Sequence, residues 1–166
     1  LVSASGAGAF TATLYLASRK SVIGLGRVIK MALYALSAGF IVFSLSGFLL
    51  LSLASLFVVG FCSIVTIASS NTLLQTVVDE KKRGRVMSLY VMAFTGTAPV
   101  GGLIAGSISE FAGAPFTIAM SGVCCLIIAA VFTAMLPGVI KTVRPILCEL
   151  GITPESECAV VEDYID

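Results

Sequence analysis

Five long runs of apolar residues, separated by short polar segments, dominate the chain. They cover about residues 2–18, 28–46, 48–74, 86–109 and 115–136. A bilayer core of about 30 Å needs roughly 20 helical residues at about 1.5 Å each, so four runs are long enough and the first is slightly short. None alternates apolar and polar residues as barrel strands do, and helices satisfy their own backbone groups in lipid. The pattern predicts an all-α, polytopic membrane protein with five transmembrane helices.

The positive charges indicate how these helices are oriented. When the five runs are threaded back and forth, all ten Lys and Arg residues fall on one side. They are Arg19, Lys20, Arg27, Lys30, Lys81, Lys82, Arg83, Arg85, Lys141 and Arg144. The turns on the other side, near Gly47 and Gly113, carry none. Short loops rich in Lys and Arg stay in the cytoplasm, so we expect these loops and the C-terminus to be cytoplasmic.

Composition agrees with a chain surrounded by lipid. Hydrophobic residues make up 58% of it and charged residues only 11%, whereas a soluble domain has about a quarter of its residues charged. The net charge is only +1, and the basic residues are spread over three loops. Neither observation indicates a nucleic-acid partner. The bilayer itself is the expected surrounding.

The residues that carry chemistry in membrane enzymes are missing from the sequence. The chain has no His, which excludes a Ser-His dyad and the HExxH zinc motif in this segment. Its five Cys form no CxxC pair and are interpreted as small packing residues. No carboxylate lies deep in a run, since Glu110 is at a rim, and proton relays use such buried groups. We therefore expect no enzyme, no metal site and no cofactor.

Hydroxyl residues mark one face of the third run. Ser52, Ser55, Val59, Ser63, Thr66 and Ser70 follow at spacings of 3, 4, 4, 3 and 4, and Asn71 extends the row. These spacings place the residues on one helical face. Two interpretations stay open. The hydroxyls bond carbonyls of their own or a neighbouring helix, or they line a water-filled cavity that passes a large, partly apolar solute.

Small residues concentrate in the first and fourth runs. Gly6 and Gly8 belong to the first, and Gly96, Pro99, Gly101, Gly102 and Gly106 to the fourth. Small faces let transmembrane helices approach closely, so we expect these residues to form a helix-packing interface. The second and fifth runs are bulkier and are expected to face lipid.

The last 30 residues differ from the rest. Residues 137–166 hold two cations and six acids, a net charge of −4. An amphipathic turn or two is compatible with Ile146 to Leu150, and the rest, with Pro154, has few large apolar side chains. We expect a flexible, solvated cytoplasmic tail. The alternative is a docking or regulatory segment.

A compact charged loop joins the third and fourth runs, with the sequence Asp79-Glu80-Lys81-Lys82-Arg83-Gly84-Arg85-Val86. Arg83 and Arg85 either hold a neighbouring helix end or carboxylate, or serve only as a topological anchor. From this loop onward the sequence resembles a known family. Residues 71–113 are similar to the C-terminal half of major facilitator superfamily transporters, through Arg83-Gly84-Arg85-Val86, Met87, Tyr90 and the glycines that follow.

Within that superfamily the chain looks most like bacterial exporters related to the enterobactin exporter and the macrolide efflux proteins. The likeness covers about residues 5–137 and implies spans eight to twelve of a twelve-span protein. The segment Leu16-Ala17-Ser18-Arg19 resembles the family's L-A-D-R loop with Ser18 in place of Asp, which puts an Asp-based latch in doubt. By the same resemblance, Arg19, Arg27, Arg83, Gly84 and Arg85 would belong to cytoplasmic gating loops. An N-terminal-half assignment is disfavoured, because the third run lacks a membrane-embedded Arg.

The resemblance implies a secondary active transporter with alternating access. It would export a small amphipathic solute, such as a drug or siderophore, across a bacterial cytoplasmic membrane, driven by an ion gradient. The third run would line its cavity, and the first and fourth would meet an N-terminal half that we expect to precede Leu1. The alternatives are a membrane anchor or sensor acting through the tail, and a truncated transporter without function.

Overall fold

The fold is a bundle of long helices. The computed structural model describes residues 2–18, 25–78 and 80–149, with side chains described as far as Gly138. Its helices are α1 (Val2–Ser18), α2 (Leu25–Leu45), α3 (Leu49–Val77), α4 (Glu80–Ala112) and α5 (Ala114–Glu149). Over these ranges there is no strand. The prediction of an all-α, polytopic membrane protein is confirmed.

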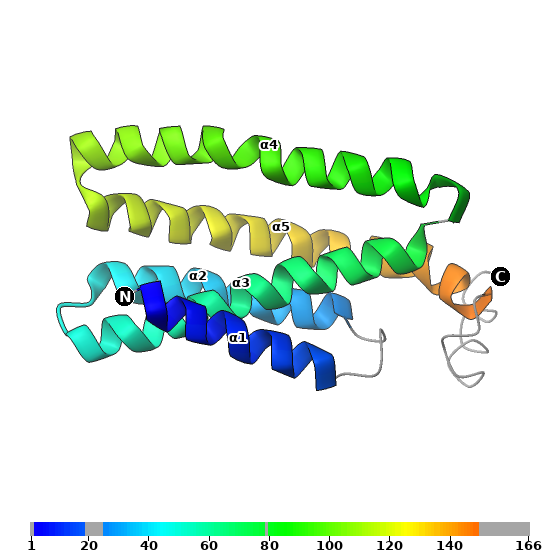
Figure 1. Ribbon diagram of the computed structural model, residues 1–166, viewed down its shortest axis with the longest axis horizontal. Helices are drawn as coiled ribbons and strands as arrows, with labels where there is room; N and C mark the ends of the chain where they lie inside the picture. The colour runs from blue at the N-terminus through cyan, green and yellow to red at the C-terminus, as the bar shows by residue number, and fades with distance from the viewer. Residues whose placement is uncertain (1, 19–24, 79, 150–166) are drawn as a thin grey trace.

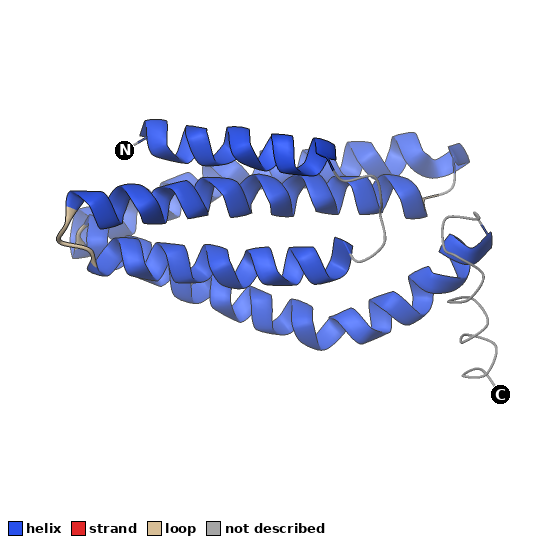
Figure 2. Ribbon diagram, turned by 90° about the horizontal axis from the view of Figure 1, so that it is seen from below, coloured by secondary structure: helices blue, strands red, loops and turns tan. Residues whose placement is uncertain are grey.

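The helices run back and forth along one long axis (Figure 1). Two short loops, residues 46–48 and Gly113, lie together at one end of the bundle (Figure 2). Gly113 makes the tighter turn with a φ of 86°, a left-handed conformation that glycine adopts without a Cβ clash. The starts of α2 and α4 lie at the opposite end (Figure 1). The described cations, from Arg27 to Lys30 and from Lys81 to Arg85, are therefore at the end away from the two loops.

Helix α2 is at the centre of the packing. It contacts α3 and α5, while α1 packs along α3. The largest cluster of buried side chains joins α1, α2 and α3 through Ala12, Ala32, Leu36, Val59, Cys62 and Val65. The expectation that the second run faces lipid holds for one side only. Met31 and Val42 are exposed, whereas Ile29 and Leu36 are buried.

Glycines allow close approach at each of the main helix contacts. Gly39 lets α2 meet α3, since a Cβ there would lie 2.8 Å from Cγ2 of Val59. Gly122 does the same for α5 against α2, where a Cβ would lie 3.2 Å from the backbone nitrogen of Ile41. Gly8 and Gly60 bring α1 and α3 together. Close backbone approach is how helices associate where lipid is as apolar as their side chains.

Helix α4 stands apart from this packing. It packs mainly against α5, and none of its residues is buried. Figure 1 shows it as the outermost helix, beyond α5. The helix is long and apolar enough to cross a membrane, yet it has 0% of its candidate span buried. Nearly all of its side-chain surface is thus available to lipid or to another helix.

Four described helices are long and apolar enough to span a bilayer, namely α2, α3, α4 and residues Ala114–Gly138 of α5. Helix α1, with 17 residues, is shorter, as its sequence suggested. Helix α4 begins at Glu80 rather than near residue 86, because an acidic residue in a first turn stabilises the start of a helix.

Helix α5 continues past the expected boundary at residue 136. It ends at Glu149, so residues 137–149 of the expected tail are helical. Apolar residues recur there at 139, 140, 143, 146 and 147, a spacing typical of one helical face. The rest of the acidic tail, residues 150–166, lies outside the described residues.

Candidate functional site

The hydroxyl row of α3 is divided into two parts by its packing. Ser55 and Val59 are 6% and 7% exposed, and Val59 lies against Gly39 of α2. This part of the row is closed by protein. Its other members are half-buried, namely Ser52, Ser63, Thr66, Ser70 and Asn71. Only these can meet a solute without separating α2 from α3.

Most hydroxyl protons of the row are already used inside α3. Ser63 Oγ donates to the carbonyl of Val59 at 2.8 Å, and Thr66 Oγ1 donates to that of Cys62 at 2.8 Å. Ser55 Oγ donates to the carbonyl of Ser52 at 3.0 Å. These bonds follow the first of the two interpretations given above, in which hydroxyls bond their own helix. The oxygen lone pairs remain, so the half-buried members of the row offer hydrogen-bond acceptors on an uncharged surface.

The end of the row nearest the described cations carries amide groups. Gln75 Nε2 donates to Asn71 Oδ1 at 3.2 Å, which holds the two side chains together one turn apart. Asn71 is half-buried and Gln75 is exposed. The pair adds polar surface where α3 approaches the end with the cations.

The small residues of α4 form an open face. A Cβ added at Gly96, Gly101, Gly102 or Gly106 would meet nothing within 4 Å. Pro99 lies inside the helix, and its lack of an N–H leaves the carbonyl of Thr95 without a helical partner. The sequence predicted a packing interface here. Among the described helices, none covers these glycines.

The two small residues predicted in α1 have different surroundings. Gly8 is buried against α3, so its contact lies within the bundle. A Cβ at Gly6 would meet nothing within 4 Å. Gly6 thus shares the open character of the α4 glycines.

The predicted gating residues lie at the ends of α2 and α4. Arg27, Arg83, Gly84 and Arg85 are all exposed. Arg19 lies outside the described residues. The structure brings the other four to one end of the bundle, away from the two short loops (Figure 1).

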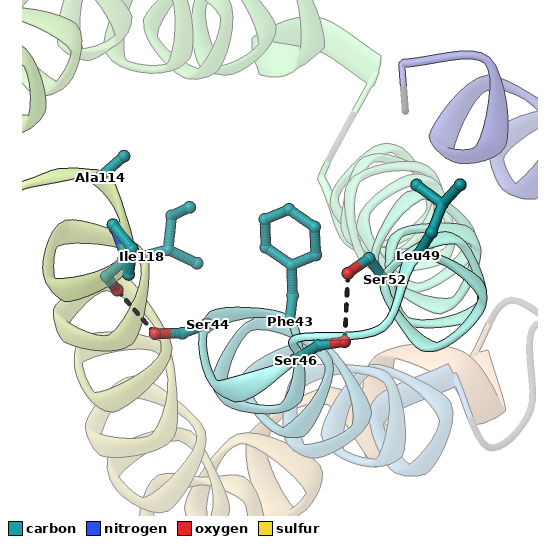
Figure 3. A pocket seen from close by; sticks show the side chains of 8 residues that line it. Phe43, Ser44, Ser46, Leu49, Ser52, Ala114 and Ile118 are labelled. Atoms are coloured by element: carbon teal, nitrogen blue, oxygen red, sulfur yellow. Dashed lines mark hydrogen bonds between the residues drawn. The ribbon is translucent and has the colours of Figure 1, made fainter.

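A pocket lies at the end with the two loops, and the sequence reasoning missed it (Figure 3). It has a volume of about 300 Å³ and is lined by Phe43, Ser44, Ser46, Leu49, Ser52, Ala114, Pro115 and Ile118. Only Ser52 was among the predicted site residues. The signal available was the concentration of serines around the turn at Gly47, but nothing in the sequence placed that turn beside the start of α5.

The described residues offer no metal centre, because no three of their His, Cys, Asp or Glu side chains lie close enough to share an ion. Cys62 is buried, and Cys124 is exposed on α5. Cys62 belongs to the apolar cluster that joins α1, α2 and α3, where a free cysteine packs as a small apolar residue.

Comparison with known proteins gives one match. The family of transmembrane secretion effectors, which belongs to the major facilitator group, matches residues 1–143. No curated protein and no solved structure matches the chain.

Proposed function

The chain belongs to the transmembrane secretion effector family of major facilitator transporters, and on that premise we propose that it is the C-terminal bundle of an alternating-access exporter. An integral, multi-pass membrane transporter is what the family match and the long apolar helices indicate. The match points to a transporter rather than an enzyme. We propose that the chain corresponds to the C-terminal half of the transporter and that it belongs to an exporter branch of the family. Both proposals rest on the sequence similarity from Arg83 to Gly106.

The observation that carries the proposal is the uncovered glycine face of α4. Gly8, Gly39, Gly60 and Gly122 are each occupied by a neighbouring helix, whereas the glycines of α4 meet nothing. Smooth faces of small residues are useful in lipid only when another backbone packs on them. We propose that an N-terminal bundle covers this face and slides on it as the transporter changes its open side.

The solute path in this proposal follows the cytoplasmic part of the α3 row. Ser63, Thr66, Ser70 and Asn71 are half-buried rather than enclosed, and no charged side chain belongs to the row. Uncharged acceptors on an apolar helix suit a small amphipathic molecule, such as a drug or siderophore, better than an ion. A coupling carboxylate would then belong to the other bundle, since the described spans of α2, α3 and α5 contain no Asp or Glu.

The proposed setting is the cytoplasmic membrane of a bacterium, with the C-terminus inside the cell. The support is electrostatic. The described Lys and Arg residues up to Arg85 gather at one end of the bundle, and such ends stay cytoplasmic during insertion.

Dye accumulation in efflux-deficient bacterial cells tests the function. Three forms would be compared, each with and without a protonophore: the gene that also encodes the proposed N-terminal bundle, the same gene without the codons for residues 150–166, and residues 1–166 alone. We expect cells carrying the gene to exclude a fluorescent cationic dye only while the ion gradient is intact. If deletion of residues 150–166 alone abolished exclusion, the working part would be the tail, as in an anchor or sensor. If every variant accumulated as much dye as cells without the gene, the proposal of drug export would be overturned.

A further inference from the structure

The pocket at the loop end of the bundle is built from three helices. Phe43 and Ser44 come from the last turn of α2, Leu49 and Ser52 from the first turn of α3, and Ala114 to Ile118 from the first turn of α5. Figure 3 shows the ring of Phe43 standing between Ile118 on the α5 side and Leu49 on the α3 side. Its volume of about 300 Å³ is at the lower end of the roughly 300–1,000 Å³ found for small-molecule sites.

Hydrogen bonds within the protein use every hydroxyl proton in the pocket. Ser44 Oγ donates to the carbonyl of Pro115 at 2.6 Å. Ser46 Oγ donates to the carbonyl of Phe48 at 3.0 Å, and Ser52 Oγ donates to Ser46 Oγ at 3.1 Å. A serine hydroxyl has one proton and two lone pairs. Ser44 and Ser52 therefore keep their acceptor lone pairs, while the pocket has no side-chain donor to give.

The lining also lacks any charge. None of the residues around the pocket is acidic or basic, and the walls are the ring of Phe43 and the aliphatic groups of Leu49 and Ile118. An ammonium or carboxylate entering here would lose hydration without gaining a counter-charge, which is unfavourable. The complementary ligand is uncharged and apolar, and it carries a proton that it can donate.

We propose that the outer ends of α2, α3 and α5 form a binding site for a small phenol or alcohol, whose hydroxyl donates to the Ser44 or Ser52 oxygen while its apolar body contacts Phe43, Leu49 and Ile118. The site is separate from the cytoplasmic part of the α3 row. Binding to it does not require transport, so the proposal stands or falls independently of the exporter function.

The chain contains no Trp, which allows a single reporter to be introduced. Leu49 lines the pocket and is 70% exposed, so Leu49→Trp places an indole at its rim with little loss of packing. We would titrate the purified full chain, in detergent micelles, with 4-butylphenol and with 4-butylanisole. The two probes have nearly the same shape, but the methylated oxygen of the anisole has no proton to donate. We expect the phenol to quench the indole fluorescence saturably. Its dissociation constant should be at least about fivefold lower than that of the anisole, which is the effect typical for one hydrogen bond.

Matched variants locate the binding. Ala114→Phe fills the pocket, whereas Ala134→Phe makes the same change at an exposed position farther along α5. The first should abolish saturable quenching and the second should leave it unchanged. Ser44→Ala and Ser52→Ala each remove one acceptor. The one that removes the oxygen bonded by the ligand should raise the dissociation constant of the phenol about fivefold and leave that of the anisole unchanged. The equivalent change Ser88→Ala, near the start of α4 and outside the pocket, should alter neither.

The indole introduced by Leu49→Trp could itself fill the pocket and block the ligand. Saturation-transfer NMR on the chain without this substitution therefore provides an independent measurement. Transfer to the ring protons of 4-butylphenol that disappears with Ala114→Phe and persists with Ala134→Phe would support the site. Equal, non-saturating signals from phenol and anisole in both measurements would show partition into the micelle and would overturn the proposal.

Discussion

Gly8 and Gly60 occupy equivalent places in one helix crossing. A Cβ on Gly8 would run into the carbonyl oxygen of Phe57, three residues before Gly60, and would lie 2.9 Å from the nitrogen of Phe61. A Cβ on Gly60 would run into the carbonyl oxygen of Ser5, three residues before Gly8. Each glycine thus makes room for the backbone of the other's helix, and the crossing of α1 and α3 depends on both.

Gly8→Ala should therefore separate α1 from α3. The atoms in the way are backbone, which cannot move aside as a side chain can, so we expect destabilisation of about 1–3 kcal/mol, as is usual for overpacking. Gly6→Ala is the matched control, because the same methyl group at that position meets nothing within 4 Å. Unfolding of the purified chain in mixed micelles, followed by circular dichroism, measures the difference. Equal unfolding midpoints for the two variants would contradict the crossing.

Bulk on the open face of α4 should stop transport without unfolding the chain. Gly102→Leu adds a side chain where this chain has no neighbour, so insertion and thermal stability should stay as they are. Efflux should be lost, because the proposed partner bundle could no longer approach. Ile104→Phe is the control, since residue 104 is exposed and lies nearly opposite both Gly102 and Gly106 around the helix. Normal efflux by Gly102→Leu would remove the interface argument.

Substitutions at the half-buried members of the α3 row should change transport more than they change stability. Thr66 donates to a carbonyl of its own helix, so Thr66→Val keeps the shape and should change the free energy of unfolding by less than about 0.5 kcal/mol, as for most substitutions that disturb no packing. It removes an acceptor from the proposed wall, and the range of exported dyes should narrow or shift.

Ser55→Leu gives the contrasting result within the same row. Ser55 is 6% exposed and lies where α2 meets α3, so the larger side chain should destabilise the bundle by about 1–3 kcal/mol. Unfolding midpoints and dye exclusion would be measured together for both variants. A Thr66→Val chain that unfolds as readily as Ser55→Leu would show that the whole row is structural.

The orientation can be tested with single cysteines in a background where the native ones are replaced. Gly47 lies in an exposed loop at one end of the bundle, and Lys82 is exposed at the other. A membrane-impermeant maleimide added to intact cells should label Gly47→Cys and leave Lys82→Cys unlabelled until the cells are opened. The reverse pattern would overturn the cytoplasmic placement of the cationic loops, which follows from the cost of moving Lys and Arg across the bilayer.

The sequence predicted the helices well and their partners poorly, for a physical reason. Apolar run length decides whether a segment spans a bilayer, so α2 to α5 were expected before the fold was known. Helix neighbours depend on contacts between distant residues, such as Val59 with Gly39, which no local pattern contains. For this reason the expectation that the second run faces lipid held on one side only, because bulky residues fit a buried centre as well as a lipid surface.

The candidate site shows the same limit. Helical spacing placed Ser52 to Ser70 on one face, but it could not show that Ser55 is closed by α2 while Ser63 remains accessible. The pocket beside Phe43 escaped notice because its walls come from residues more than 60 positions apart along the chain, as the bond from Ser44 to Pro115 illustrates. The small residues of α4 were recognisable in the sequence, and the structure added that none of the residues it describes covers them.

Helix α4 buries none of its residues. The amount of chain that survives in a cell should therefore depend on what packs against this helix. Burial stabilises the packing of α1, α2, α3 and α5 against one another, whereas α4 gains almost none of that free energy and is held mainly by its contact with α5. Membrane proteases act on segments that open. If the proposed N-terminal bundle covers α4, it should also protect the chain from degradation, and the amount of chain that accumulates in a cell should rise with the amount of that bundle present.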